Sequence, residues 1–239
     1  MISKTAQLSQ DKWAQLRGYS GDDPIAGACA DSNFSPGVYP GLKNESGEAA
    51  FAKKRKVALW DFGDGFRASK LLSGYGFIPI IINHNMSADE VIAKEPDGIM
   101  LSGGPGDPAA NPGIVCEIKN LCAKIKSRNI PVIAVGLGHQ LLALANGAKT
   151  EKMKFGNRGA NVPVLEHDTG RVFVTEQNHG YAVIPGLLPA NAVISHSNIN
   201  DGTCEGLIYK DMRALSVQFD PTDAVVGRFT AMMSDNKQL

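Results

Sequence analysis

The chain has 239 residues, enough for one α/β domain of about 180 to 200 residues with an extension. Hydrophobic residues make up 43% and charged residues 20%, a composition that excludes a chain disordered throughout. The 24 basic and 24 acidic residues balance, so the sequence does not favour nucleic acid as a partner.

Cysteine spacing and hydropathy exclude further classes. Cys29, Cys116, Cys122 and Cys204 lack the spacing of a metal motif, so we expect reduced thiols, no metal site and no cofactor. No apolar stretch is long enough to span a membrane. Residues 1–20 lack the apolar core of a secretory signal. We therefore expect an intracellular protein, cytoplasmic or organellar, with mitochondria included, and not a secreted one.

Residues 1–55 differ in amino-acid composition from the rest of the chain. The stretch "SGDDPIAGACADSNFSPGVYPGLKNESGEAA" is dominated by helix breakers and small polar residues, which predicts an extended arm. Trp13 and Tyr19 lie in this arm and would be costly to leave in water, so they favour packing on the domain or on a protein partner.

Residues 56–239 are predicted to form the folded domain. Its first half alternates short apolar runs, "KVALWDFG", "FIPIIIN", "GIMLSGG" and "IPVIAVG", with amphipathic segments. Helices are predicted over Phe66–Tyr75, Ala88–Lys94, Gly113–Arg128 and Gly138–Asn146. This alternation is typical of an α/β, flavodoxin-like fold with a mostly parallel sheet flanked by helices.

The half after Gly147 is rich in predicted strands. The apolar runs "RVFVTEQNHGYAVI", "NAVISHSNIN", "CEGLIYK" and "ALSVQFD" are read as strands, and a helix is predicted over Ala224–Met233. This reading places His196 at the end of a strand and Cys204 in a loop before the next one.

Two glycine-rich turns mark the expected site. Ser102–Asp107 follows one predicted parallel strand and Gly136–Gly138 follows the next. Open α/β sheets bind ligands at the carboxyl ends of their strands, so these turns are expected to line one pocket. The second turn, in "PVIAVGLGHQ", has the strand-to-helix form that usually presents a nucleophile, but its tip is Gly136.

Four ordered blocks carry a family resemblance. They are "PDGIMLSGGPGDP", "IPVIAVGLGHQLLALANGAKTEKMKFGNRGANVPV", "TEQNHGYAV" and "SVQFDP". The combination resembles the class I glutamine amidotransferase domain, and most closely that of the carbamoyl-phosphate synthase small chain. The resemblance covers about Lys56 to Met233. It implies that residues 1–55 are a remnant of the family's N-terminal domain.

The resemblance also identifies a replaced catalytic triad. Family members carry a Cys that attacks the glutamine carboxamide, a His that activates the thiol and a Glu that orients the His. The corresponding positions here are Gly136, Asp220 and Thr222. Glycine supplies no nucleophile, and a carboxylate with an ordinary pKa of about 3.9 is a poor base at neutral pH. We therefore predict no catalytic residues and no thioester.

The binding half of the family's site is better matched. The resemblance assigns substrate contacts, vestigial or retained, to Gly104, Gly106, Leu137, Gln140, Asn178, Gly180 and Tyr181. Backbone N–H groups at such turns can hold a carboxylate or an oxyanion whatever the neighbouring side chain. The glycines are explained equally well by the backbone freedom and close packing that the turns need.

Three functions follow from these observations. The first is a catalytically inactive amidotransferase-like subunit with a structural or regulatory role in a protein complex, its partner being a carbamoyl-phosphate synthase-like large chain or a larger assembly. The alternatives are a glutamine-hydrolysing small subunit that supplies ammonia to a large subunit, and a sensor of glutamine or a small anion. The first rests on the joint loss of the three triad groups.

Overall fold

The computed structural model describes residues 55–234. The predicted arm, residues 1–55, therefore lies almost entirely outside the described residues, and the proposed division of the chain at residue 56 stays a prediction. The helices are α3 (Gly65–Gly74), α4 (Ala88–Ile92), α5 (Pro112–Arg128), α6 (Leu137–Ala145) and α7 (Asp223–Ser234). The strands are β1 (Lys56–Asp61), β2 (Ile78–Asn83), β3 (Gly98–Leu101), β4 (Val132–Val135), β5 (Thr150–Glu166), β6 (Val172–Val183), β7 (Ala192–Asn198), β8 (Cys204–Tyr209) and β9 (Ala214–Val217).

One nine-stranded sheet organises the described residues, in the order β2-β1-β3-β4-β9-β8-β6-β5-β7. The pairings from β2 to β9 are parallel, and the pairings beyond β9 are antiparallel. Strands β3, β4 and β9 are buried along their whole length. Continuous apolar runs of this kind are what a parallel strand covered on both faces requires. The expected α/β fold is confirmed, with the parallel part confined to one half of the sheet.

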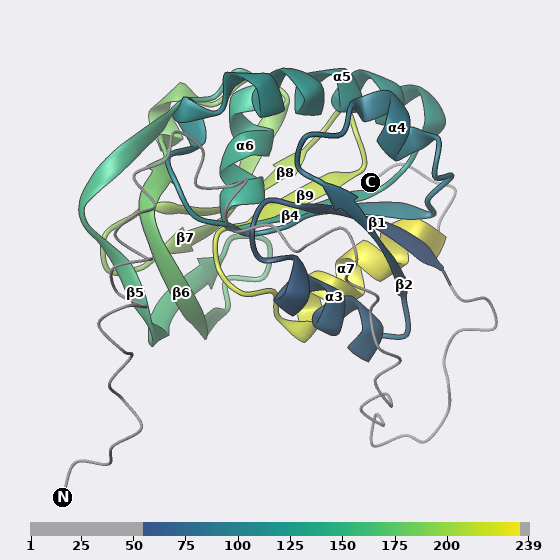
Figure 1. Cartoon of the computed structure of the whole chain (residues 1–239). Coiled ribbons are helices and arrows are strands. Elements are labelled where there is room, and N and C mark those ends of the chain that lie inside the picture. The colour runs from purple at the N-terminus through teal and green to yellow at the C-terminus, as the bar shows by residue number, and fades with distance from the viewer. Residues whose placement is uncertain (1–54, 235–239) are drawn as a thin grey trace, which may run out of the picture.

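Helices cover both faces of the parallel half (Figure 1). On one face α4, α5 and α6 contribute Val91, Leu121 and Leu141 to a buried cluster that contains Trp60 of β1. On the other face α3 and α7 contribute Leu72 and Phe229, among others, to a second cluster. The two cores fix the strand ends between them, and the glycine turns project from those ends.

The antiparallel half contains a strand that sequence reasoning missed. β5 is 17 residues long, and together with β6 it forms the long ribbon at the side of the sheet (Figure 1). Most of its residues are exposed or half-buried, so the strand lacks the apolar alternation that identifies strands in a sequence. Its register shifts between Lys152 and Asn157 and again between Gly159 and Val162.

Two sequence-based placements are wrong. His196 lies inside β7 and is buried, because its ring packs between Phe173 and Phe219. Cys204 is the first residue of β8 and is fully buried. The two strands themselves are those predicted from "NAVISHSNIN" and "CEGLIYK", and only the positions of these two residues within them differ. The predicted helices agree with the structure to within two residues at every end.

Candidate functional site

The strand-to-helix turn between β4 and α6 has the predicted form. Gly136 has φ of 54° and ψ of −114°, and the helix begins at the next residue, Leu137. The Gly136 N–H donates to the Val217 carbonyl at 2.9 Å, which holds the turn against β9. The Leu137 N–H is the first of the helix and therefore has no acceptor within it. The turn thus presents the Leu137 backbone donor beside Gly136, the position where a nucleophile would usually stand.

Close packing explains two of the neighbouring glycines. A Cβ at Gly104 would overlap the Phe62 carbonyl, and one at Gly138 would overlap the Leu101 carbonyl. Gly136 differs, because the nearest atom to a Cβ there is the Gly103 Cα at 3.5 Å. Space does not require a glycine at the tip of the turn, so only its backbone conformation favours one.

A cavity of about 740 Å³ opens over the carboxyl ends of the parallel strands. It is lined by loop residues that follow β1, β3, β4 and β9, and by residues of the β5–β6 ribbon. The sequence-predicted positions that it brings together are Gly104, Gly106, Gly136, Leu137, Gln140, Asn178, Gly180, Tyr181 and Asp220. Thr222 is not among its lining residues. Its hydroxyl instead lies 3.5 Å from the Val225 N–H in the first turn of α7.

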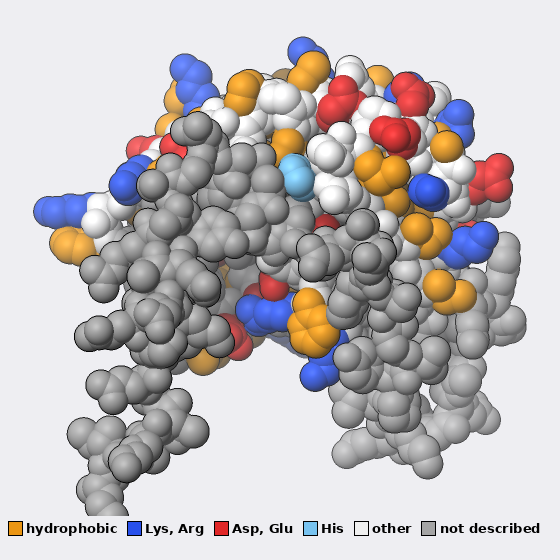
Figure 2. All heavy atoms as spheres, in the orientation of Figure 1, with side chains coloured by type: hydrophobic (Ala, Val, Ile, Leu, Met, Phe, Trp, Pro, Cys, Tyr) orange, Lys and Arg blue, Asp and Glu red, His pale blue; other side chains and the backbone are white. Residues whose placement is uncertain are grey.

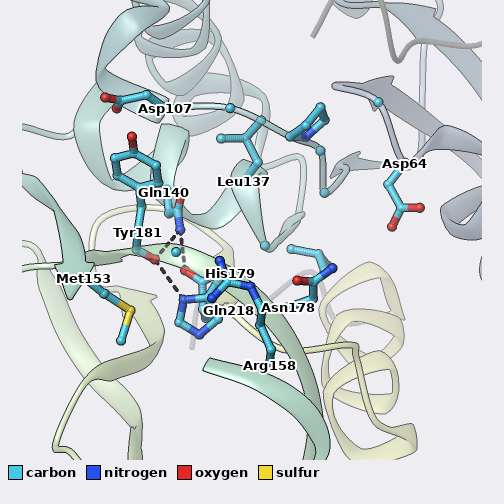
Figure 3. A pocket seen from close by; sticks show the side chains of 18 of the residues that line it. Asp64, Asp107, Leu137, Gln140, Met153, Arg158, Asn178, His179, Tyr181 and Gln218 are labelled. Atoms are coloured by element: carbon cyan, nitrogen blue, oxygen red, sulfur yellow. Dashed lines mark hydrogen bonds between the residues drawn. The ribbon is translucent and has the colours of Figure 1, made fainter. Parts of the chain in front are cut away.

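Gln140 connects the two sides of this cavity (Figure 3). Its side-chain amide donates to the Tyr181 carbonyl and to Gln218 Oε1, each at 2.8 Å. The Tyr181 carbonyl also lies 2.9 Å from the Nδ1 atom of His179. The wall formed by Asn178 to Tyr181 is therefore fixed to helix α6 and to the segment after β9.

An ion pair occupies the position predicted for the base. Asp220 Oδ2 binds the Arg67 guanidinium, whose side chain comes from α3. Asp220, more than the other acidic neighbours, raises the pKa of Arg67, and burial raises the pKa of nearby Asp64. The carboxylate at this position is thus engaged by a permanent cation, and no imidazole stands there to accept a proton.

Among the remaining candidate nucleophiles and bases of the described residues, His179 lines the cavity, where burial lowers its pKa and its ring nitrogens lie beside the Tyr181 carbonyl and Gln177 Oε1. The cysteines and His139 lie elsewhere. Cys116 is exposed on α5, while Cys122 and Cys204 are buried, and burial raises their thiol pKa to about 11 and about 12. None of these three lines the cavity. His139 is also outside the lining. Burial lowers its pKa to about 3, and its Nδ1 atom lies 2.8 Å from Ser216 Oγ.

The cavity wall includes charged residues that sequence reasoning did not single out. Lys152, Lys154 and Arg158 reach it from β5, and Asp64 and Glu176 reach it from the loop after β1 and from β6. The alternation in "KMKF" was an available signal, because residues two apart share one face of a strand. Charged side chains of both signs are also interspersed over the visible face of the molecule (Figure 2).

The described part of the chain contains neither a group of metal-binding side chains nor a helix that could span a membrane. Between residues 55 and 234 no three or more His, Cys, Asp or Glu side chains are arranged to hold a metal ion. None of the helices in this range is long and apolar enough to cross a membrane.

Comparison with known proteins identifies the family to which this chain belongs. The family model described as glutamine amidotransferase class-I matches residues 58–234. The chain is 36% identical over 225 residues to a chloroplastic carbamoyl phosphate synthase small chain of Oryza sativa, covering 91% of this chain and 49% of that one. It is 47% identical over 173 residues to a carbamoyl phosphate synthase small chain of Lactococcus lactis, covering 72% and 47%. The chain spans about half the length of these relatives.

Solved structures share the fold at low sequence identity. A glutamine amidotransferase from Thermotoga maritima has a TM-score of 0.54 at 16% identity, covering 77% of this chain and 84% of that one. A glutamine amido transferase from Methylobacillus flagellatus has a TM-score of 0.51 at 16% identity, covering 75% of each chain. These likenesses concern the fold alone.

Proposed function

We propose that this chain, which belongs to the class I glutamine amidotransferase family, keeps the family's pocket without its glutaminase chemistry and acts as a binding subunit of a protein complex. The observation that carries the proposal is Gly136 at the tip of the β4–α6 turn. No side chain stands there to attack an amide carbon.

The chemistry of the surrounding residues supports the same proposal. Hydrolysis through a thioester needs a nucleophile and a base within hydrogen-bond reach of it. Asp220 is paired with Arg67, and the described thiols and His139 lie outside the cavity lining. His179 lines the cavity, but both of its ring nitrogens face neighbouring oxygens, and no thiol of the described residues stands beside it. Two of the three triad positions therefore line the pocket with groups unsuited to their family roles, and the third, Thr222, lies outside it.

Binding is supported by what lines the rest of the cavity. The Leu137 N–H at the start of α6 and the glycine-rich segment at Gly104 and Gly106 offer backbone donors to a carboxylate or an amide oxygen. Asn178 and Tyr181 face the same space from β6. We propose these residues, with Gln140 and Gly180, as the contacts of a glutamine-like ligand.

A second function is favoured by the relatives themselves. Both curated relatives described above are named carbamoyl phosphate synthase small chains. Such a subunit would hydrolyse glutamine and pass ammonia to a large chain. For this chain to do so, a nucleophile would have to come from outside residues 55–234 or from the partner subunit. The same relatives support a carbamoyl-phosphate synthase-like large chain as the partner, with a larger assembly as the other candidate.

Two measurements on the full chain separate these functions. Ammonia release from glutamine is assayed with the protein alone and with whatever co-purifies with it. We expect none above the uncatalysed rate. Glutamine-dependent release that a Gln140→Leu substitution abolishes would overturn the inactive assignment and establish the second function.

Calorimetry with glutamine and with glutamate then tests the pocket. Saturable binding of either at millimolar concentration or below supports a retained pocket, and an accompanying change in the partner interaction would identify a sensor. No binding at millimolar ligand would overturn the proposed contacts and leave a structural role alone.

Restoring the triad provides a direct probe. The variant combining Gly136→Cys, Asp220→His and Thr222→Glu is compared with the same variant carrying Arg67→Asn. We expect the second to be alkylated faster by an electrophilic glutamine analogue, because Arg67 no longer occupies the space beside residue 220. Equal labelling of both would show that Arg67 does not obstruct the restored residues.

A further inference from the structure

A buried carboxyl group lies directly behind the pocket wall. Glu205 on β8 is fully buried, and its Oε1 atom is 3.8 Å from the Nε2 atom of His179, whose residue lines the cavity. The other carboxyl oxygen of Glu205 makes no hydrogen bond of good geometry among the described residues, although the Asn198 side-chain amide lies near enough to offset in part the rise in pKa that burial causes. A buried acid that is half unpartnered is costly unless a proton or a cation compensates it.

The surroundings of Glu205 have a place for a proton. The Thr203 hydroxyl lies 2.9 Å from Glu205 Oε1 and 2.7 Å from Asp201 Oδ1. A hydroxyl has one hydrogen and can donate it to only one of these two oxygens. When Thr203 donates to Asp201, a protonated Glu205 can donate to Thr203. Burial raises the pKa of Glu205 to about 7, and this effect outweighs the Thr203 hydrogen bond to the carboxylate, which lowers it.

The surroundings of His179 have a place for the same proton. Its Nδ1 atom is 2.9 Å from the Tyr181 carbonyl, and its Nε2 atom is 3.0 Å from Gln177 Oε1. A neutral imidazole can donate through only one of its nitrogens, whereas an imidazolium donates to both oxygens. Burial lowers the pKa of His179, so the charged ring is retained only with a compensating anion nearby.

We infer that Glu205 and His179 share one proton behind the pocket wall, and that Glu205 is a positioning residue that charges His179 when a ligand carboxylate occupies the pocket. This inference rests on the proposed function, because it presumes a ligand with a carboxylate. The charged ring would donate to the Tyr181 carbonyl, which Gln140 also binds, and so would hold the wall that the ligand contacts.

Other titratable and charged groups also face His179. Arg158 from β5 lowers the pKa of the ring, and Asp201 from the loop before β8 raises it. His139 from α6 is fully buried, and its own pKa is lowered to about 3. A ligand carboxylate adds a negative charge on the pocket side and favours the proton on His179.

The consequence is a pH-dependent affinity. Above a pH of about 7 the Glu205 carboxyl has lost its proton, so binding of a carboxylate requires proton uptake. Affinity then falls as pH rises. Uptake of one proton with a midpoint near 7 predicts about a tenfold loss of affinity between pH 6 and pH 8.

The test compares the wild-type chain with Glu205→Gln by NMR of the histidine rings and by calorimetry with glutamine. Without ligand, we expect the His179 signals of the wild type to change between pH 6 and pH 8, and those of Glu205→Gln to stay at neutral-ring values. The loss of glutamine affinity between pH 6 and pH 8, measured by calorimetry, should also be absent in Glu205→Gln. Glu166→Gln is the matched control, because Glu166 Oε1 lies 3.9 Å from His196 Nε2, and neither residue lines the cavity.

The outcomes separate this inference from the proposed function. Identical His179 titrations in the wild type and Glu205→Gln would overturn the shared proton, whether or not glutamine binds. A His179 titration that differs between the wild type and Glu205→Gln, together with no glutamine binding, would uphold the proton pair and overturn the proposed function. If Glu205→Gln does not fold, Thr203→Val replaces it. That variant removes a hydrogen bond to the carboxylate and should move the His179 midpoint to higher pH, and an unmoved midpoint would overturn the inference.

Discussion

Replacing Gly136 with alanine tests whether the β4–α6 turn has the strained form of a nucleophile-bearing turn. The substitution adds one methyl group at a backbone with φ of 54° and ψ of −114°. The nearest atom to the new Cβ would be the Gly103 Cα at 3.5 Å, an ordinary van der Waals separation. Overlap with neighbours therefore contributes little, and the effect on stability comes from the backbone.

The magnitude follows from two opposing terms. A non-glycine residue in a sparsely populated conformation costs about 1–3 kcal/mol. Removing a glycine from the unfolded chain stabilises the native state by about 0.4–1 kcal/mol. We expect a net loss of about 1–2 kcal/mol in the free energy of unfolding. For a domain of this size that loss lowers Tm by roughly 2–8 °C.

Urea denaturation followed by circular dichroism measures the change. Gly113→Ala is the control, because Gly113 lies in α5 with an ordinary φ and a Cβ added there would meet no atom within 4 Å. We expect the control to be unchanged or stabilised by up to about 1 kcal/mol. If Gly136→Ala is as stable as Gly113→Ala, the turn is not strained and the comparison with a nucleophile-bearing turn loses its physical basis.

Three further outcomes are expected. Arg67→Gln should change the free energy of unfolding by less than about 1 kcal/mol in urea, because the side chains of its ion pair with Asp220 are 60% and 42% exposed. Phe229→Ala should cost about 3–5 kcal/mol in the same assay, since the ring is fully buried against Phe77. Among the described cysteines, Cys116 should react first with a maleimide, with the two buried thiols labelled only after unfolding, and mass spectrometry of peptides would detect the contrary order.

The parallel half of the fold could be predicted because its signals are local. Short, fully apolar runs such as "VIAV" alternate with amphipathic helices, and each pattern reflects burial on two faces or on one. The β5 strand could not be found in this way. Its residues are held by pairing with β6, and most of them stay partly exposed to water. The strand therefore lacks the alternation of apolar and polar residues that burial of one face would produce.

The sequence by itself determined that Gly136 leaves the turn without a nucleophile, since the identity of a residue decides which atoms it can offer to a reaction. Only the tertiary structure decided what surrounds that turn. It brings Arg67 to Asp220 across 153 residues of chain, and it places Glu205 of β8 behind His179 of β6. Pairings of this kind depend on strand order and on the register between strands. Both are set by packing of the whole sheet, so the residues near each partner carry no trace of them.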